Sequence, residues 1–375
     1  MRIAIITLPL MGNYGGILQN YALQTVLKRM GHTVDTLSLP WKLKLPLWKR
    51  PLSWGKRFVK KMLLRSGTRI FYEQWYNRTQ LMLLKNMWRF VAERISIRRV
   101  KSFSVLRPCD YEAFVVGSDQ IWRPCYTYCP ISDVYLFFAK TWKGVKRVAY
   151  AASFGTDQWE YTPEQTGQCA ALANLFDGIS VREASAVKLC REHLDCEAQH
   201  VLDPTMLLTA DDYIRLFEDK SLLEPRGQLL TYVLDESAEK NEIIQKIANQ
   251  QQYKLYRANS RYYEEGSAPL DERVQPSVEQ WLKDFYEAEF VITDSFHATV
   301  FSILFGKPFI VIGNRERGLS RLESLLKMFS LENHLVHTVG ELKPAQDYAF
   351  DTIRVTEVLQ HLREESMSFL RKTLQ

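Results

Sequence analysis

The chain repeats a pattern in which a short apolar run, a turn and a segment with helically spaced apolar residues follow one another. Residues 2–8 are apolar almost throughout, as in a parallel strand that is buried on both faces. In residues 17–30 the apolar side chains recur every three or four positions, which predicts a helix that ends at Gly31. Residues 33–39 predict a second strand. This order opens a doubly wound parallel sheet.

The alternation resumes after an interruption at residues 41–105. Further strands are predicted at residues 111–116, 145–152, 178–181, 199–202, 228–234, 254–257, 290–293 and 308–313. We therefore expect an α/β protein with two Rossmann-like lobes, GT-B-like, and a C-terminal helix that crosses back to the first lobe. The expected boundaries are an N-terminal lobe at 1–206 that contains the insertion, a C-terminal lobe at 207–345 and the closing helix at 346–375.

Composition supports a globular protein. A chain of 375 residues with 46% hydrophobic and 25% charged residues fits two packed domains. No stretch of about 20 residues is free of polar groups, and the apolar run near the N-terminus lacks a cleavage pattern, so we expect a cytoplasmic location. The six cysteines are dispersed and should be thiols. Cys125 and Cys129 have the spacing CxxxC, but no matching pair completes a metal site, so no metal is expected.

Six polar motifs follow predicted strands, at the edge where open parallel sheets gather their ligand groups. They are NYGG at 13–16, VGSDQIW at 116–122, YAASFG at 150–155, ISVRE at 179–183, VLDPT at 201–205 and VITDSFH at 291–297. Taken in this order, the motifs resemble those of the polysaccharide pyruvyl transferase family. The resemblance implies a GT-B-like fold with its active site between the lobes, and transfer of the enolpyruvyl group of phosphoenolpyruvate onto sugar hydroxyls in surface polysaccharide biosynthesis. It implies no cofactor besides phosphoenolpyruvate as co-substrate.

Two residues are candidates for catalysis. His297 follows a buried strand at the start of a helix, where an imidazole can act as a general acid or hold a phosphate. Asp119 is a candidate base or hydroxyl ligand for the acceptor, and equally a turn or helix cap. Asp203 with Pro204 is interpreted as ordering the hinge between the lobes.

Phosphoenolpyruvate carries about three negative charges near neutral pH, so its site needs fixed cations, and arginine binds both carboxylate and phosphate through two parallel hydrogen bonds. The candidate donor-binding residues are Arg182, Ser295, Arg315, Arg317 and Arg321. The candidate acceptor-binding residues are Asn13, Tyr14, Gly15, Gly16 and Ser118.

The insertion is strongly basic. From Trp41 to Tyr72 there are ten lysines or arginines and no acidic residue, and apolar and cationic faces are predicted for the helix that follows Trp54. One hypothesis is that residues 41–65 contact the anionic inner leaflet of the cell membrane, where lipid-linked sugars are built. The alternative is a helical hairpin that covers the first lobe and keeps a solvated basic face. Nucleic-acid binding is not expected, since no known module accompanies the charge.

Two other functions remain open. A GT-B glycosyltransferase that uses a nucleotide sugar fits the architecture equally well, and the loop of His297 would then hold a pyrophosphate. A non-catalytic protein of polysaccharide assembly is the third class.

Overall fold

The computed structural model describes residues 1–40, 43, 45–63, 69–218, 227–260, 263, 268–313 and 318–375. Its strands form two parallel sheets, with the order β3-β2-β1-β4-β5-β6-β7 in the first and β12-β11-β10-β8-β9 in the second. The strands are β1 Arg2–Ile6, β2 Thr33–Ser38, β3 Ile97–Arg99, β4 Ala113–Val116, β5 Lys146–Ala152, β6 Gly178–Val181, β7 Gln199–His200, β8 Leu229–Tyr232, β9 Leu255–Arg257, β10 Phe290–Thr293, β11 Phe309–Ile312 and β12 Leu335–Val336. The predicted fold class is thereby confirmed.

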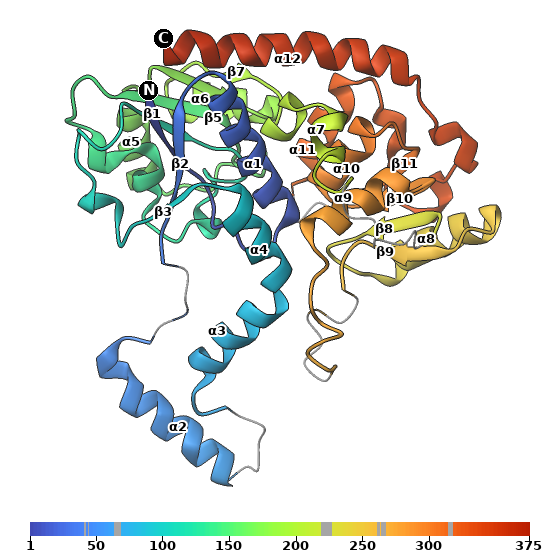
Figure 1. Ribbon diagram of the computed structural model, residues 1–375, viewed down its shortest axis with the longest axis horizontal. Coiled ribbons are helices and arrows are strands. Elements are labelled where there is room, and N and C mark those ends of the chain that lie inside the picture. The colour runs from blue at the N-terminus through green and yellow to red at the C-terminus, as the bar shows by residue number, and fades with distance from the viewer. Residues whose placement is uncertain are drawn as a thin grey trace.

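Helices separate most of these strands and cover both sheets (Figure 1). They are α1 Tyr14–Arg29, α2 Arg50–Leu63, α3 Tyr72–Leu83, α4 Lys85–Arg94, α5 Pro163–Ala173, α6 Ala184–His193, α7 Ala210–Ile214, α8 Ala238–Gln251, α9 Val278–Glu287, α10 Phe296–Leu304, α11 Leu319–Met328 and α12 Thr352–Leu374. Ser277 accepts a hydrogen bond from the backbone N–H of Gln280 and thereby caps α9.

Helix α1 begins earlier than predicted. Asn13 is its N-cap and accepts a hydrogen bond from the backbone N–H of Gly16, so Tyr14, Gly15 and Gly16 form the first helical turn instead of a turn before the helix. The prediction was wrong here because glycines are poor helix formers in general, whereas the cap and the burial of Tyr14 stabilise the helix at this position.

The two lobes share one apolar core. Tyr14 of the first lobe stacks on Trp281 of the second, with ring centroids 5.3 Å apart, and its hydroxyl donates a 2.8 Å hydrogen bond to the carbonyl of Pro276. Gly318, at φ 82°, lies so close to the carbonyl oxygen of Gly155 that a Cβ there would overlap it. These contacts fix the strand ends of the two sheets against each other.

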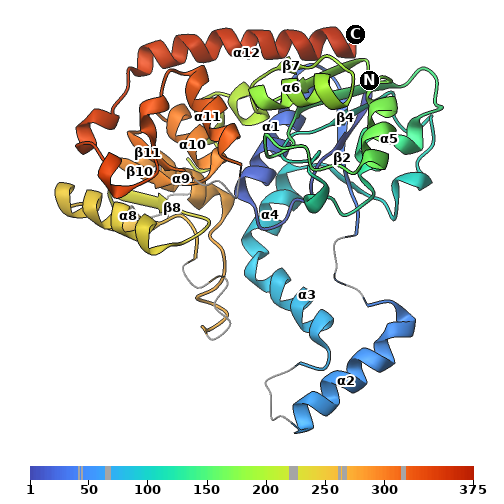
Figure 2. The same ribbon diagram turned by 180° about the vertical axis from the view of Figure 1, so that it is seen from behind.

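Helix α12 crosses from the second lobe to the first, along the side of the molecule opposite α2 (Figures 1 and 2). Near its start Thr352 lies beside Gly306, where an added Cβ would come within 3.2 Å of its methyl group, and near its end Phe369 packs on Tyr150 at a centroid distance of 6.2 Å. The backbone N–H of Leu202 donates to the hydroxyl of Ser366. The helix therefore ties both lobes together, as predicted.

The insertion is not wholly helical. Its last part contributes β3, which pairs with β2 at the edge of the first sheet, and α4 buries Phe90 against Tyr21 of α1. Helix α2 and most of α3 instead project away from both lobes (Figure 2). The alternative in which α2 covers the first lobe is therefore wrong.

Candidate active site

Arg182 lies at the centre of a buried cluster of charges. It follows β6, and its guanidinium group donates hydrogen bonds of 2.8 Å to Asp203 and 3.1 Å to Asp119. The two aspartates follow β7 and β4, so all three side chains come from the carboxyl edge of one parallel sheet. Burial alone would lower the pKa of Arg182, but the carboxylates of Asp119 and Asp203 raise it above its ordinary value. Arg182 therefore remains a fixed cation inside the protein.

Asp203 joins this cluster to the rest of the site. It also accepts hydrogen bonds from the hydroxyls of Ser118, at 3.2 Å, and Thr205, at 2.7 Å. Burial opposes ionisation, but the neighbouring His297 and Arg182 hold its pKa far below the ordinary value. The interpretation of Asp203 as a hinge residue missed this central position. The sequence did contain a signal for this role, because Asp203 directly follows a predicted strand, as the other polar motifs do.

His297 enters the cluster from the second lobe, in the first turn of α10. Its Nε2 lies 3.5 Å from a carboxylate oxygen of Asp203, is buried, and has no hydrogen-bond partner among the described residues. The other side of the ring packs against Gly15 of α1, where a Cβ would overlap the imidazole. His297 thus lies between two elements of the first lobe, with one ring nitrogen beside an ionised carboxylate.

Two further side chains of the second lobe complete the cluster. The ring of Phe296 contacts the guanidinium groups of both Arg182 and Arg321, at 4.6 and 6.0 Å from its centroid. This is the geometry of cation–π attraction. Burial, together with the charge of Arg182, lowers the pKa of Arg321 to about 10. Two cations are therefore held near each other by an aromatic ring and by the surrounding carboxylates.

Glu183 is a site residue that the sequence analysis did not select. Its Oε1 accepts a 3.0 Å hydrogen bond from the backbone N–H of Phe154, while Oε2 is buried and lacks a hydrogen-bond partner within the described chain. Burial raises the pKa of Glu183 although Arg182 and Arg321 act in the opposite direction. No local pattern distinguishes it from an ordinary glutamate, because its environment is formed by distant elements.

The predicted acceptor residues have different environments. Asn13 is exposed, whereas Tyr14 and Ser118 are buried in packing and hydrogen bonds. The backbone N–H of Ser118 donates to the side chain of Gln19. Gly16 lies beside Asp119, since a Cβ there would be 3.4 Å from its carboxylate. Glycines of α1 thus bring its first turn close to the charge cluster.

The structure describes three of the five residues predicted to bind the donor. Ser295 is the N-cap residue of α10 and is largely buried, next to His297. Arg182 and Arg321 lie together in the cluster, as described above. Arg315 and Arg317 lie outside the described residues.

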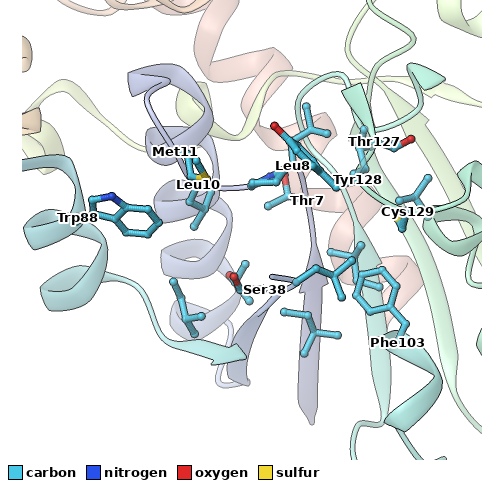
Figure 3. A pocket seen from close by; sticks show the side chains of 18 residues that line it. Thr7, Leu8, Leu10, Met11, Ser38, Trp88, Phe103, Thr127, Tyr128 and Cys129 are labelled. Atoms are coloured by element: carbon cyan, nitrogen blue, oxygen red, sulfur yellow. The ribbon is translucent and has the colours of Figure 1, made fainter. Parts of the chain in front are cut away.

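A separate cavity of about 50 Å³ opens beside the ends of β1 and β2 (Figure 3). Its lining is mostly apolar and includes Leu10, Met11, Leu39, Trp88 and Tyr128. Met11 lies two residues before the N-cap of α1, so the cavity adjoins the loop that leads into the candidate site.

Within the described part of the chain, no group of three or more potential ligands is arranged to hold a metal ion. All six cysteines are free thiols. In the same residues, no helix has both the length and the apolar character needed to cross a bilayer.

The fold and the site define a two-lobed α/β protein in which a histidine of one lobe approaches a carboxylate of the other, and that carboxylate is itself paired with an arginine. The chain belongs to the polysaccharide pyruvyl transferase family, whose model matches residues 13–316. The resemblance seen in the six motifs is thereby confirmed.

No curated protein matches the chain at a significant level. Among solved structures, the chain is similar to a glycosyltransferase from Rickettsia africae, at 11% identity and a TM-score of 0.48, with 100% of this chain and 97% of the other covered. It is also similar to a UDP-GlcNAc 2-epimerase from Neisseria meningitidis, at 10% identity and a TM-score of 0.45, with 100% and 94% covered.

Proposed function

We propose that this transferase moves the enolpyruvyl group of phosphoenolpyruvate onto two hydroxyls of a sugar and forms a ketal. The family supports a saccharide acceptor and a transferred pyruvyl group. The observation that carries the proposal is the approach of His297 to Asp203 across the two lobes, beside the guanidinium groups of Arg182 and Arg321.

The charge balance of the cluster bears on donor binding. Arg182 and Arg321 supply two positive charges, and the lowered pKa values of Asp119 and Asp203 keep two negative charges in the same place. A donor with about three negative charges therefore needs more cations than these two arginines provide. We assign that role to Arg315 and Arg317, together with the backbone N–H groups at the start of α10.

Proton transfer is the step for which the imidazole is suited. Protonation of the methylene carbon of the donor produces a cationic centre at C2, which one sugar hydroxyl attacks as it loses its proton. The proton lost by the first hydroxyl restores the acid that protonated the methylene carbon. The second hydroxyl then displaces phosphate, and its proton leaves on the phosphate as hydrogen phosphate. We propose that His297 supplies the first proton, because its Nε2 is sheltered from solvent and held beside Asp203.

Asp119 has a different role in this proposal. Burial disfavours the ionised form of the Asp119 carboxyl, but the nearby Arg182, His297 and Arg321 lower the pKa of Asp119 below its ordinary value. A carboxylate with a lowered pKa accepts hydrogen bonds well but is a weak base. We therefore propose that Asp119 orients an acceptor hydroxyl that approaches along the first turn of α1, where Gly16 lies beside its carboxylate.

The test is incubation of the protein with phosphoenolpyruvate and candidate glycans, followed by measurement of released phosphate and mass spectrometry of the glycan. The expected result is a pyruvate adduct that appears together with phosphate. A parallel incubation with nucleotide sugars tests the alternative of a glycosyltransferase. Glycosyl transfer without a pyruvate adduct would overturn the proposal, and transfer from neither donor would favour the non-catalytic class.

We further propose that the protein works on the cytoplasmic side of the membrane on an acceptor that is held by a lipid. The basic segment 41–65 supports this location, since anionic lipids attract clusters of lysine and arginine.

A further inference from the structure

Helix α2 exposes an apolar surface that nothing else in the described chain covers. None of the side chains of α2 is buried. Leu52, Met62 and Leu63 are 73%, 66% and 77% exposed, and Phe58 and Val59 are about half exposed. Soluble proteins rarely leave so many large apolar side chains together on one helix.

The orientation of α2 explains why this surface faces outward. The helix meets α3 along the edge of its polar side, where Arg57 forms a bidentate salt bridge with Glu73, with N–O distances of 2.6 and 2.8 Å. Next to this pair, Trp54 packs edge to face against Phe71 at a centroid distance of 5.1 Å. An amphipathic helix of a globular domain normally packs its apolar side inward. Here the packing is reversed, so the apolar side is presented to the surroundings.

Cations border the apolar surface. Lys56 and Lys60 lie along one flank of it and Lys61 along the other, all three exposed, and residues 45–63 contain no acidic side chain. Apolar side chains with flanking lysines match the interface of an anionic bilayer, where the former enter the acyl region and the latter meet the lipid headgroups. A second copy of this chain would bring like charges together, which makes it the poorer partner.

We propose that α2 lies flat on an anionic membrane surface and holds the protein there. The arm, residues 45–63 and 69–83, leaves the first lobe after the C-terminal end of β2. Asp119 and Arg182 follow strands of the same sheet at that same edge. Docking through α2 therefore places the side of the molecule opposite α12 toward the bilayer (Figures 1 and 2).

Two cavities lie where the arm joins the first lobe, and their position is consistent with this orientation. A groove of about 760 Å³ and the smaller cavity of Figure 3 share Leu39 and Trp88 in their lining. Both lie where the arm joins the first lobe, and the smaller one reaches Met11, close to the first turn of α1. This part of the inference rests on the proposed function: an acceptor held in the bilayer would approach the site past apolar surface.

The experiment is flotation of the full-length protein with vesicles of phosphatidylcholine alone and of phosphatidylcholine with phosphatidylglycerol, without any substrate. We expect binding to the anionic vesicles only. Replacement of Lys56, Lys60 and Lys61 by glutamine should weaken it roughly a hundredfold, at about fivefold per lysine. The matched control replaces Lys188, Lys254 and Lys372, three exposed lysines of the two lobes, and should bind as the wild type does.

A second pair of variants tests the apolar contact. L63S should weaken binding by about tenfold, whereas I353S, at a residue that is 74% exposed on α12, should leave it unchanged. Equal flotation of the wild type and the lysine variant, or no flotation at all, would overturn the proposal. The proposal would also be overturned if the wild type self-associates and L63S loses this self-association but still binds vesicles. Because no substrate is present, these results are independent of whether phosphoenolpyruvate is the donor.

Discussion

Gly15 of α1 lies directly against the imidazole of His297 of α10, although the two residues belong to different lobes. The absence of a Cβ at Gly15 is what lets the ring approach, and the opposite ring nitrogen then comes to within 3.5 Å of Asp203. The position of the histidine thus depends on a helix turn that the sequence analysis assigned to acceptor binding.

The first prediction concerns this contact. G15A should displace His297 or separate the lobes, because the added methyl group has no room beside the ring. We expect a loss of transfer activity and a lower melting temperature. The matched control is G167A in α5, where nothing lies within 4 Å of the added group. It should retain activity and gain about 0.5–1 kcal/mol of stability. Equal activity of both variants would show that the contact is dispensable.

The second prediction concerns the imidazole itself. H297A should lower kcat by about 10²- to 10⁴-fold, the usual loss when a general acid is removed. The value of kcat is measured from the rate of phosphate release from phosphoenolpyruvate in the presence of acceptor. H361A is the control, since that side chain is 75% exposed on α12. A value of kcat that is unchanged while KM for the donor rises would assign His297 to phosphate binding instead of proton transfer.

The third prediction concerns Arg182. R182L would leave Asp119 and Asp203 buried without their counter-ion, so we expect a loss of about 3–5 kcal/mol in the free energy of unfolding, measured with urea. Addition of D203N should recover part of that loss, because it removes one of the stranded charges. R191L, at an exposed ion pair, should leave the unfolding midpoint unchanged. A small effect of R182L would mean that the aspartates are protonated in the folded protein.

The fourth prediction concerns pH. Burial raises the pKa of Glu183 above its ordinary value of 4.5. The folded protein therefore holds this proton more tightly than the unfolded chain, and stability falls as the pH rises from 4.5 through the folded-state pKa. E183Q resembles the protonated form and should escape this loss, so its melting temperature relative to the wild type should increase from pH 5 to pH 8. E192Q, an exposed residue of α6, should show no such trend. A constant difference would contradict the raised pKa.

Several features followed from the sequence because they depend on neighbours in the chain. The alternation of apolar runs and helical segments predicted ten of the twelve described strands and missed the edge strands β3 and β12. A serine before an amphipathic run is the cap of α9. The six motifs identified the family, and they lie at the strand ends that carry Asp119, Arg182 and His297. The basic composition of the insertion was also visible without a structure.

Tertiary structure alone decided which of these residues meet. Asp119 is 63 residues and Asp203 is 21 residues from Arg182 along the chain, and their shared ion pairs form only when three strands align at one edge. The burial of Glu183 and the outward apolar face of α2 were decided in the same way. Local patterns fix the elements because they act through backbone hydrogen bonds and side-chain periodicity. Burial, charge pairing and exposure depend on how distant elements pack, and no single segment carries that information.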